Sequence, residues 1–571
     1  MTREPITTIM TSITDAGAPG PGAERPTVLD GRSAELGEGT LVDAVAAHVS
    51  ERPDAVAVEA DGSTLTYAEL WDAAARVAGA LGEAGVERGD QVAIWATRTA
   101  PVVAAALAVM ALGAGYVPID PTYPPARVRR ILEVGRPKVM VCADADALGG
   151  SLPRGMATVD VRASARPAGV LVPAARQGDV AYTVFTTGST GLPKGVLVDH
   201  RALVNYLGWA RELTGFETGD ATPCFASLGF DHAVTCLWLP LMVGGSVQLI
   251  PDSWDPRPWL APRARPFAFV KITPSHVRLF ERIAHPDYRA ITRTVMFGGE
   301  RLDAALVASL GPRIEGIGLL NHYGPTEATV GCTAYPFAAG AVTGEGALPI
   351  GTPVWNSRAY VVDADLRPVP LGEEGELVLA GACVAQGYLG GDAADRARFL
   401  DEADLLGGAE GEGAGARAYR TGDRCVVCDG QLHYLGRLDE QVKVRGHRIE
   451  TQEVHDLAVA VPGVAHAAVT VSQTGLGGLE LFVVPDGDAR AEGLVARVLE
   501  RLRGELPGAA VPERVRIVPN LVVNAHGKWD PAATRALADE TAAAADRAAA
   551  EAGPDGGDEG SGGRGEDRGS S

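Results

Sequence analysis

Residues 186–195 read TTGSTGLPKG, and this stretch determines the expected fold more than any other part of the chain. Its glycines and hydroxyl residues leave backbone N–H groups and side-chain oxygens free to surround an anion, because glycine permits unusual φ values and close approach. Lys194 adds a positive charge at the end of the loop. Pro193 stands where the Walker pattern GxxxxGK[ST] requires glycine, so this is a different type of phosphate loop. The pattern predicts an anion-binding loop, and the alternative is a polar surface turn.

The flanking segments alternate between strand and helix patterns. Thr66 and Glu69 have the spacing of a capping box, and apolar residues then recur at helical intervals. Residues 91–95 (QVAIW) indicate a buried strand, residues 101–112 an apolar helix, and residues 138–142 another strand. Strands that alternate with helices predict an α/β protein whose mostly parallel sheets are covered on both faces.

Composition excludes several classes of function. The 571 residues carry a net charge of −21, with 46% hydrophobic and 22% charged residues, which is ordinary for a globular protein. A nucleic-acid or anionic-membrane binder would need a basic face, so neither partner is expected. The seven cysteines are too dispersed for a disulfide scaffold, and residues 1–12 lack the apolar segment of a secretory signal. A cytoplasmic location is therefore expected.

Two local patterns raise alternatives that the sequence itself argues against. Residues 101–119 carry no charge, as a membrane span would, but glycines and a proline interrupt their second half. A buried helix followed by a turn is the better interpretation. Cys425 and Cys428 form a lone CxxC inside a strand pattern, where positions i and i+3 face opposite sides. We therefore expect no metal or redox role for this pair.

Changes in composition divide the chain into four parts. Residues 1–38 are rich in Gly, Pro, Thr and Ala and are expected to be a flexible arm. Residues 39–438 form the large core, and residues 439–538 a second, smaller unit with strands at VAHAAVTV and LELFVV. Residues 539–571 are rich in Ala, Gly, Asp and Glu and are expected to be a disordered tail.

Further motifs accompany the loop. They are LTYAEL (65–70), MALGAGYVPID (110–120), NHYGPTEAT (321–329), GELVLAGACVAQGYL (375–389), YRTGD (419–423), GRLDEQVKVRGHRIE (436–450) and HGK (526–528). Together they extend over about residues 40–535 and closely resemble the adenylate-forming (ANL) superfamily, in particular the amino acid adenylation domains of nonribosomal peptide synthetases. The resemblance implies a large N-terminal core of mainly parallel sheets with a small β-barrel-like subdomain. A small mobile C-terminal α+β subdomain would follow.

The resemblance implies that Mg-ATP activates a carboxylate as an acyl-AMP, which is then passed to a thiol. Catalysis would rest on charge neutralisation and positioning, because two anions must meet. Tyr323 is expected to stack on adenine, Thr326 to contact the α-phosphate, and Asp423 to accept the ribose hydroxyls. Glu327 is expected to hold Mg²⁺, for which a carboxylate is a suitable ligand. The residues implied to bind ATP or AMP are Thr186, Thr187, Gly188, Ser189, Thr190, Gly191, Lys194, Gly298, Gly299, Glu300, Asn321, Tyr323, Gly324, Thr326, Asp423 and Arg437.

Three residues of the smaller unit are implied to act in catalysis. Lys528 matches the lysine that bridges the substrate carboxylate and the α-phosphate, a task that suits a point charge on a flexible stem. Asp439 corresponds to a hinge, about which a rotation would remove Lys528 after adenylation. Lys443 lies on the face that the rotation would bring in for thiol transfer.

The substrate pocket is implied by the segment Phe230-Asp231-His232-Ala233, in which Asp231 would bind the α-ammonium of an amino acid. The other positions assigned to the pocket are His232, Thr235, Lys271, Met296, Gly298, His322, Val330 and Gly331. A buried lysine would be costly unless the substrate paired with it, so Lys271 favours an acidic side chain. The pocket resembles those for L-aspartate and next those for L-asparagine. The alternative is that Lys271 points to solvent and the substrate is neutral.

The implied partners are an amino acid and a separate phosphopantetheinylated carrier protein, because no carrier site or HHxxxDG motif occurs in the chain. The resemblance also leaves open a small helper protein. Thr451-Gln452 replaces the Leu-Gly that the family usually has near the pantetheine tunnel, so the resemblance leaves open the transfer step and the identity of the thiol partner. The competing interpretations are an acyl-CoA ligase, against which Asp231 argues, and a non-catalytic relative that binds nucleotide or amino acid.

Overall fold

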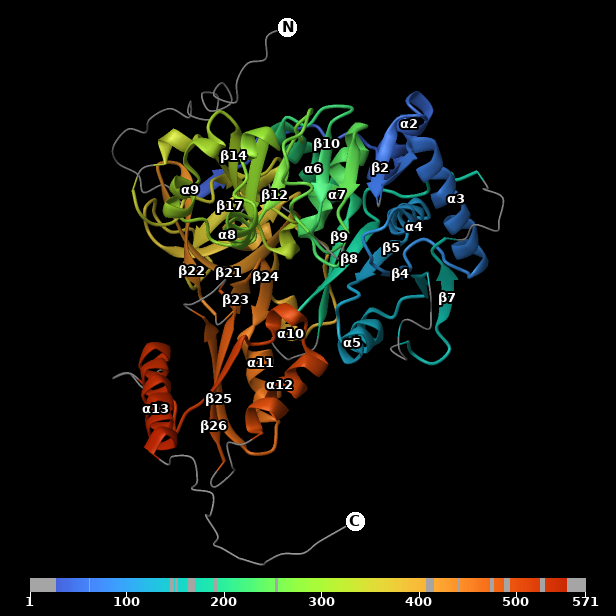
Figure 1. Cartoon of the computed structure of the whole chain (residues 1–571). Helices are drawn as coiled ribbons and strands as arrows, with labels where there is room; N and C mark the ends of the chain where they lie inside the picture. Colours follow the sequence, from blue (N-terminus) through green and yellow to red (C-terminus); the bar gives the residue numbers. More distant parts are fainter. Residues whose placement is uncertain are drawn as a thin grey trace, which may run out of the picture.

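The computed structural model describes residues 27–60, 62–143, 148, 152–162, 170–187, 193–251, 255–342, 344–406, 415–439, 441–472, 477–486, 493–523 and 529–551. A large N-terminal core of sheets and helices stands above a small C-terminal subdomain (Figure 1). The predicted α/β class is confirmed, although the sheets of the core are mixed rather than purely parallel.

A seven-stranded sheet carries the phosphate loop. Its strands, in spatial order, are β19 (Gly387–Leu389), β9 (Lys194–Asp199), β8 (Val180–Thr186), β5 (Gly115–Ile119), β4 (Gln91–Trp95), β6 (Val139–Cys142) and β7 (Ala157–Asp160). The strands β8, β5, β4, β6 and β7 run parallel to one another. Strand β9 pairs antiparallel with β8, and β19 pairs antiparallel with β9. Strands β8 and β9 pair as a hairpin, so the TTGSTGLPKG motif joins two neighbouring strands at the edge of the parallel set.

The helices beside this sheet form as their sequences predict. Helix α3 (Tyr67–Glu83) begins with the capping box, in which Thr66 Oγ1 accepts from the Glu69 N–H at 3.2 Å and the Glu69 carboxylate accepts from the Thr66 N–H at 2.8 Å. Helix α4 (Ala100–Ala111) is buried on nearly every side, which explains its uncharged sequence. Within the described ranges, no helix is long and apolar enough to cross a membrane. Three further helices of the core are α2 (Leu41–Glu51), α5 (Pro125–Gly135) and α6 (His200–Thr214).

Two further sheets complete the main part of the core. One has the order β10 (Ala221–Cys224), β11 (Ser246–Leu249), β2 (Val56–Ala60) and β3 (Ser63–Thr66). The other has the order β12 (Val270–Ile272), β13 (Thr294–Gly298), β14 (Gly318–Tyr323), β15 (Thr333–Phe337) and β16 (Thr352–Pro353). Their helices are α7 (His232–Val243), α8 (Pro274–Ile283) and α9 (Ala304–Leu310). Strands β12, β13 and β14 are parallel, so their carboxyl ends meet at one edge.

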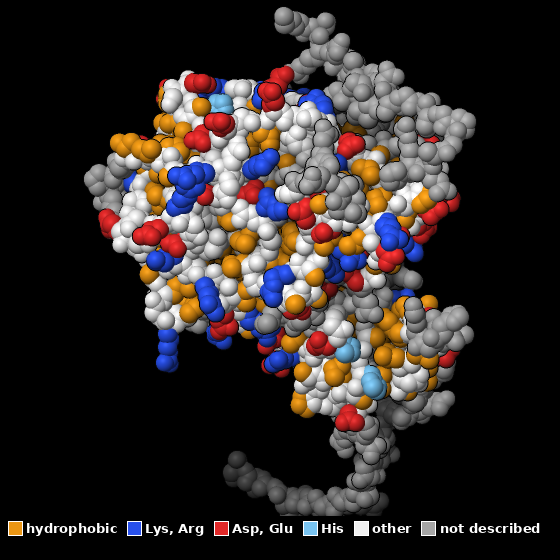
Figure 2. Space-filling model, turned by 180° about the vertical axis from the view of Figure 1, so that it is seen from behind, with side chains coloured by type: hydrophobic (Ala, Val, Ile, Leu, Met, Phe, Trp, Pro, Cys, Tyr) orange, Lys and Arg blue, Asp and Glu red, His pale blue; other side chains and the backbone are white. Residues whose placement is uncertain are grey.

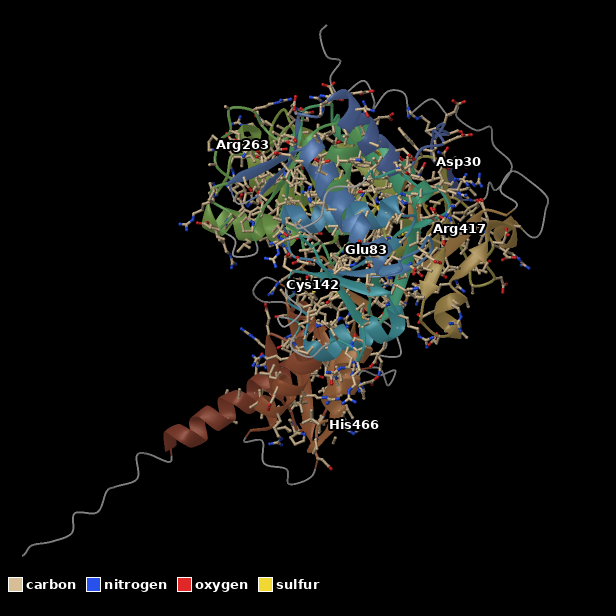
Figure 3. The ribbon with its side chains drawn as sticks, turned by 90° about the vertical axis from the view of Figure 1, so that its right-hand side faces the viewer. Asp30, Glu83, Cys142, Arg263, Arg417 and His466 are labelled. Atoms are coloured by element: carbon tan, nitrogen blue, oxygen red, sulfur yellow. The ribbon has the colours of Figure 1, made fainter. Side chains whose placement is uncertain are left out.

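An antiparallel six-stranded sheet forms the last part of the core. Its path is β1 (Val28–Asp30), β17 (Ser357–Val362), β18 (Gly375–Gly381), β21 (Arg417–Cys428) and β20 (Phe399–Asp401), with β22 (Gln431–Arg437) also paired to β21. Helix α10 (Ala393–Arg396) precedes β20. Within β21, Cys425 is buried and Cys428 is exposed, which confirms that the two cysteines face opposite sides. Figure 3 shows Asp30 and Arg417 on this side of the core, away from His466 in the C-terminal subdomain.

The C-terminal subdomain begins after β22, with the predicted boundary at 438/439 falling between β22 and β23. Its hairpin is β23 (Gln441–Val444) with β24 (His447–Glu450), and its sheet is β25 (Val464–Val471), β26 (Leu479–Pro485) and β27 (Arg514–Ile517). Helices α11 (Thr451–Val459) and α12 (Leu494–Glu505) share its core, which includes Val454, Leu481 and Val498. Helix α12 also packs against α5 of the large core, where Arg130 and Glu505 form an ion pair at 2.8 Å.

Two expectations about the ends of the chain are wrong where the structure describes them. Residues 28–30, placed in the flexible arm, form β1, because they pair antiparallel with β17 and add an edge strand to the six-stranded sheet. Residues 539–551, placed in the disordered tail, belong to helix α13 (Pro531–Glu551), which follows from their high alanine content. Figure 3 shows this helix extending outward from the subdomain. Residues 1–26 and 552–571 lie outside the described residues.

Charge is distributed over the surface rather than gathered in one place on the face that Figure 2 shows. Acidic and basic side chains alternate over the back of the core. On that face the described acidic side chains are separated by basic and uncharged ones and form no single patch.

Candidate active site

A cavity of about 500 Å³ lies where the carboxyl ends of the core strands meet the β23–β24 hairpin. Thr186 at the end of β8, Lys271 in β12 and Tyr323 at the end of β14 contribute to its walls from the core. Lys443 and Arg448 contribute from the C-terminal subdomain. Ligands of α/β proteins bind at the carboxyl ends of parallel strands, so the fold itself places a binding site here.

The phosphate loop is described only at its two ends. Thr186 and Thr187 line the cavity, whereas Gly188, Ser189, Thr190 and Gly191 lie outside the described residues. Lys194 is 1% exposed, and its ammonium donates to Asp395 Oδ1 at 2.7 Å. The ammonium also lies 4.8 Å from the centre of the Tyr388 ring.

Sequence reasoning missed the partners of Lys194. Asp395 lies in the first turn of α10, where its spacing from Asp392 indicates only a helix cap. A buried lysine requires a counter-charge, but the 201 positions between Lys194 and Asp395 hide this pair from any local pattern.

The nucleotide side of the cavity is built from three strands. Asp423 in β21 lies directly opposite Arg437 in β22 in the antiparallel register. Its carboxylate accepts from Arg437 Nη1 at 2.8 Å and from the Tyr323 hydroxyl. The ammonium of Lys443 lies 5.2 Å from the centre of the Tyr323 ring. The structure therefore brings together four residues that the sequence assigns to nucleotide binding or catalysis.

The turn after β13 forms another wall. The Glu300 carboxylate accepts from the Ser275 N–H at 3.0 Å and from the Ser275 hydroxyl at 2.8 Å, which ties the turn to the start of α8. Gly299 has φ +80°, and a β-carbon there would lie 3.3 Å from Gly446 Cα, so glycine suits this crowded position. Asn321 donates to the Pro349 carbonyl at 2.6 Å. Gly324 and Thr326 also line the cavity.

Glu327, expected to bind Mg²⁺, is fully buried. Its two carboxylate oxygens lie 3.1 and 2.9 Å from Arg448 Nη1, and one of them accepts from the Tyr388 hydroxyl at 2.5 Å. Burial alone would raise the pKa of Glu327, but Arg448 and Lys194 outweigh it and hold the pKa at about 2. The carboxylate is therefore ionised and suits a hard divalent cation. Among the described residues it belongs to no group of three or more potential metal ligands, so nucleotide phosphates would have to complete the coordination.

Asp439, the predicted hinge residue, lies at the junction with the subdomain. Its carboxylate accepts from Arg437 Nε at 2.8 Å, from Arg437 Nη2 at 2.6 Å and from Arg398 Nη2 at 3.2 Å. Burial opposes its charge, but these arginines lower the pKa of Asp439 overall. The junction is thus fixed by ion pairs in the arrangement described here.

Lys528 lies outside the described residues. Val523 and Trp529, on either side of the gap, form an isolated β-bridge with each other. The Trp529 ring packs against Phe482 with ring centres 6.2 Å apart. Neither Val523 nor Trp529 is among the residues that line the cavity.

Asp231 and Lys271, both assigned to the amino acid pocket, line the cavity. Asp231 precedes α7 without capping it, and burial raises the pKa of its carboxyl despite a Thr326 hydrogen bond and the nearby Lys271 charge. Lys271 is 2% exposed and donates to Thr235 Oγ1 at 2.9 Å. Burial lowers its pKa to about 8. Lys271 lines the cavity and is buried, so the alternative in which it points to solvent is wrong.

Three further residues assigned to the pocket, Met296, Gly298 and Gly331, lie beside Lys271 or His322. Met296 lies opposite Lys271 in the β12–β13 register, and Gly298 lies opposite His322 in the β13–β14 register. A β-carbon at Gly331 would come within 1.8 Å of His322 Nε2, so this position has room only for glycine. The other predicted members are Phe230, His232 and Val330, all of which line the cavity.

The subdomain covers the pocket through its hairpin. The His447 ring meets the Phe230 ring edge-on, with centres 4.2 Å apart. A second contact joins α5 to α11, where the buried side chains of Arg127 and Glu453 lie 3.6 Å apart. Glu453 directly follows the Thr451-Gln452 pair that departs from the family's usual sequence. These contacts close the cavity from the side of the subdomain.

A cavity of about 500 Å³ at the carboxyl ends of the core strands, lined by residues of the quoted motifs, is the arrangement expected of an adenylate-forming ligase. The family model for AMP-binding enzymes matches residues 45–389, and the model for the AMP-binding enzyme C-terminal domain matches residues 453–528. The chain therefore belongs to the AMP-binding enzyme family, and it is of the nonribosomal peptide synthetase adenylation type.

Individual relatives agree with this assignment. Tyrocidine synthase 3 of Brevibacillus parabrevis is 32% identical over 519 residues, which is 89% of this chain and 8% of that protein. The solved structure of holo-PA1221, an NRPS protein containing adenylation and PCP domains bound to a vinylsulfonamide inhibitor, has a TM-score of 0.73 and 26% identity, covering 87% of this chain and 84% of that one. Holo-AB3403, a four-domain nonribosomal peptide synthetase bound to AMP and glycine, has a TM-score of 0.62 and 30% identity, covering 88% and 36%. The chain thus spans a small part of the longest of these relatives.

Proposed function

We propose that this ligase activates an L-amino acid with an acidic side chain as its aminoacyl-AMP and passes it to the phosphopantetheine thiol of a carrier protein. L-Aspartate is the preferred candidate, followed by L-asparagine or another acidic analogue. The observation that carries the proposal is the buried Lys271 ammonium, whose hydrogen-bond partner is the neutral Thr235 hydroxyl. Among the described residues, no carboxylate forms an ion pair with it. A substrate carboxylate would supply the missing charge.

The substrate's α-ammonium would be held by the second buried charge of the pocket, the Asp231 carboxylate. Desolvation by burial, together with the nearby Glu327 charge, raises the pKa of that carboxyl, and an ammonium ion beside it would stabilise the ionised form. Asp231 thereby favours an amino acid over a fatty or aryl acid, which offers no cation to pair with it. The acyl-CoA ligase remains the alternative, and formation of a CoA thioester in place of a loaded carrier protein would identify it.

In the adenylation step, a carboxylate oxygen attacks the α-phosphorus of ATP and pyrophosphate leaves. Thr186 and Thr187 at the end of β8 would hold the phosphates, and Asp423 would hold the ribose. Lys528 would neutralise the charge that builds up between the carboxylate and the α-phosphate. A magnesium ion held by Glu327 and the phosphates would supply further neutralisation of the triphosphate.

In the transfer step, the carrier thiol attacks the acyl carbonyl and AMP leaves. We infer that the described arrangement belongs to this second step. Arg448 engages both oxygens of Glu327, and Lys443 approaches the nucleotide side of the cavity. Trp529, next to Lys528 in the chain, lies against Phe482 outside the cavity lining. Adenylation would therefore require the subdomain to rotate about the Asp439 junction.

Amino-acid-dependent pyrophosphate exchange tests the proposal directly. A panel of the common amino acids and β-carboxylate analogues is expected to give the highest kcat/KM with L-aspartate and the next with L-asparagine. The reason is that these side chains can accept hydrogen bonds from Lys271. A preference for a neutral aliphatic or aromatic amino acid would show that Lys271 does not bind the substrate side chain. The absence of exchange with every amino acid tested would contradict amino acid activation itself.

The charge on Lys271 also predicts a pH dependence. Because burial lowers its pKa to about 8, the ammonium is retained below that pH and lost above it. The kcat/KM for aspartate in pyrophosphate exchange is therefore expected to fall above about pH 8, approaching tenfold per pH unit. The matched control is Lys271→Leu, whose residual aspartate exchange should not show this fall. A wild-type profile that stays level to about pH 9.5 would contradict a role for the charged form.

A further inference from the structure

Four side chains from four different elements form a chain of hydrogen bonds behind the amino acid pocket. Lys271 Nζ lies 2.9 Å from Thr235 Oγ1, and Thr235 Oγ1 lies 2.5 Å from the Tyr206 hydroxyl. The Tyr206 hydroxyl lies 3.3 Å from His322 Nε2. All four are at most 4% exposed. Tyr206, on α6, belongs to none of the motifs and was missed by sequence reasoning.

The donor and acceptor capacities of Lys271 and His322 determine the direction of this chain of hydrogen bonds. The Lys271 ammonium can only donate, so Thr235 Oγ1 accepts from it. The Thr235 hydroxyl can then donate its single proton to the Tyr206 oxygen. The Tyr206 hydroxyl can in turn donate its proton to His322 Nε2. In the opposite direction the Thr235 proton would have no acceptor among the described residues. A buried hydroxyl proton without an acceptor loses its hydrogen bond to water and gains none in the protein, which disfavours that direction.

This direction determines which nitrogen of His322 carries hydrogen. Burial lowers the pKa of His322 well below its usual range, so the ring is neutral and has one N–H. Since Nε2 accepts from Tyr206, the hydrogen is on Nδ1. Within the described part of the chain, Nδ1 has no hydrogen-bond partner, and a β-carbon at Gly298 would lie 3.4 Å from it. Glycine at this position thus leaves room for substrate atoms beside Nδ1.

We propose that Tyr206 is a positioning residue that determines side-chain specificity, because its hydroxyl holds His322 in the form that donates from Nδ1. This inference rests on the proposed function. His322 and Lys271 then present two donors, which match the two acceptor oxygens of a carboxylate. The carboxamide of asparagine has one acceptor oxygen and an NH₂ group that would face a donor. The chain of hydrogen bonds therefore favours aspartate over asparagine.

The test measures the ratio of kcat/KM for aspartate to that for asparagine in pyrophosphate exchange. Tyr206→Phe is expected to lower this ratio by at least about tenfold, since one misplaced polar contact of this type is worth at least about 1.4 kcal/mol. The KM for ATP should stay unchanged. Tyr288→Phe is the matched control, because its hydroxyl is buried in a different hydrophobic cluster and has no hydrogen-bond partner among the residues that the structure describes. That variant should leave the ratio as in the wild type.

A double-mutant cycle separates this role from general packing. An asparagine at position 322 can place its own N–H group near the position of Nδ1 and does not depend on Tyr206. In the His322→Asn background, Tyr206→Phe is therefore expected to leave the ratio unchanged. An equal fall in both backgrounds, or no fall in either, would overturn the inference. If Tyr206→Phe does not fold, Thr235→Val breaks the same chain and should lower the ratio in the same way.

The wild-type enzyme distinguishes failure of this inference from failure of the proposed function. If the wild type does not activate aspartate, the proposed function is wrong and the inference falls with it. If the wild type prefers aspartate but neither Tyr206→Phe nor Thr235→Val lowers the ratio of kcat/KM for aspartate to that for asparagine, only the inference is wrong.

Discussion

Replacing Lys271 by leucine is expected to reduce kcat/KM for aspartate by at least about 100-fold in pyrophosphate exchange. Leucine keeps most of the side-chain volume but removes the charge, so the substrate carboxylate would be buried without a partner. Breaking a buried ion pair in this way costs about 3–5 kcal/mol, which corresponds to a factor of 100 or more. Nucleotide affinity, measured by calorimetry with ATP, should change little.

The specificity of the Lys271→Leu variant is the sharper measurement. Activation of neutral amino acids such as leucine or valine should rise relative to aspartate, because an apolar wall replaces the ammonium. The wild type and a variant of an exposed lysine, Lys138→Ala, serve as controls; the Lys138 side chain is 48% exposed. Unchanged aspartate kinetics in Lys271→Leu would show that the pocket is wrongly assigned.

Replacing Lys528 by alanine is expected to slow adenylation by about 100-fold or more. The physical reason is the loss of the one mobile cation that would lie between the carboxylate and the α-phosphate, where negative charge concentrates. Pyrophosphate exchange at saturating aspartate and ATP measures this step. Wild-type exchange in the variant would refute the assignment of Lys528.

Lys443 provides the contrasting variant for the other half-reaction. Lys443→Ala should depress loading of the carrier protein, observed by intact mass, more than it depresses pyrophosphate exchange. Its ammonium lies beside Tyr323 only in an arrangement that has the β23–β24 hairpin at the cavity. Equal losses in both assays for Lys443→Ala and Lys528→Ala would contradict a division of the two steps between two orientations of the subdomain.

Short contiguous patterns allowed much of the fold to be predicted. The capping box of α3, the apolar run of α4 and the strands β4, β25 and β26 each follow from residues close together in sequence. The two errors concern β1 and α13 at the ends of the chain. Strand β1 forms because it can pair with β17, in which Tyr360 lies opposite Val28. The composition around residue 28 cannot indicate a partner strand that lies 332 residues away in the sequence.

The residues of the candidate site also fall into two groups, those that a motif indicates and those that only the fold brings together. Asp231, Tyr323, Glu327 and Asp423 lie in motifs whose residue types already indicate their chemistry. The pairing of side chains within the site is not indicated by any local pattern: Asp395 with Lys194, Arg448 with Glu327 and Tyr206 with His322 are joined across 201, 121 and 116 positions, although Arg448 itself lies in the 436–450 motif. Their residue types are ordinary for a helix cap, a surface strand and an amphipathic helix.

The sequence alone indicated the superfamily, the expected phosphate loop and the charges expected around the substrate. These features reside in short contiguous motifs, which can be recognised from their residue types without knowledge of the fold. Tertiary structure alone decided which charges are paired, which side chains form the hydrogen-bond chain to His322 and that Lys443 of the C-terminal subdomain lines the cavity. The physical reason is that pairing and desolvation act over a few ångströms in space, and chain folding sets those distances independently of separation along the sequence.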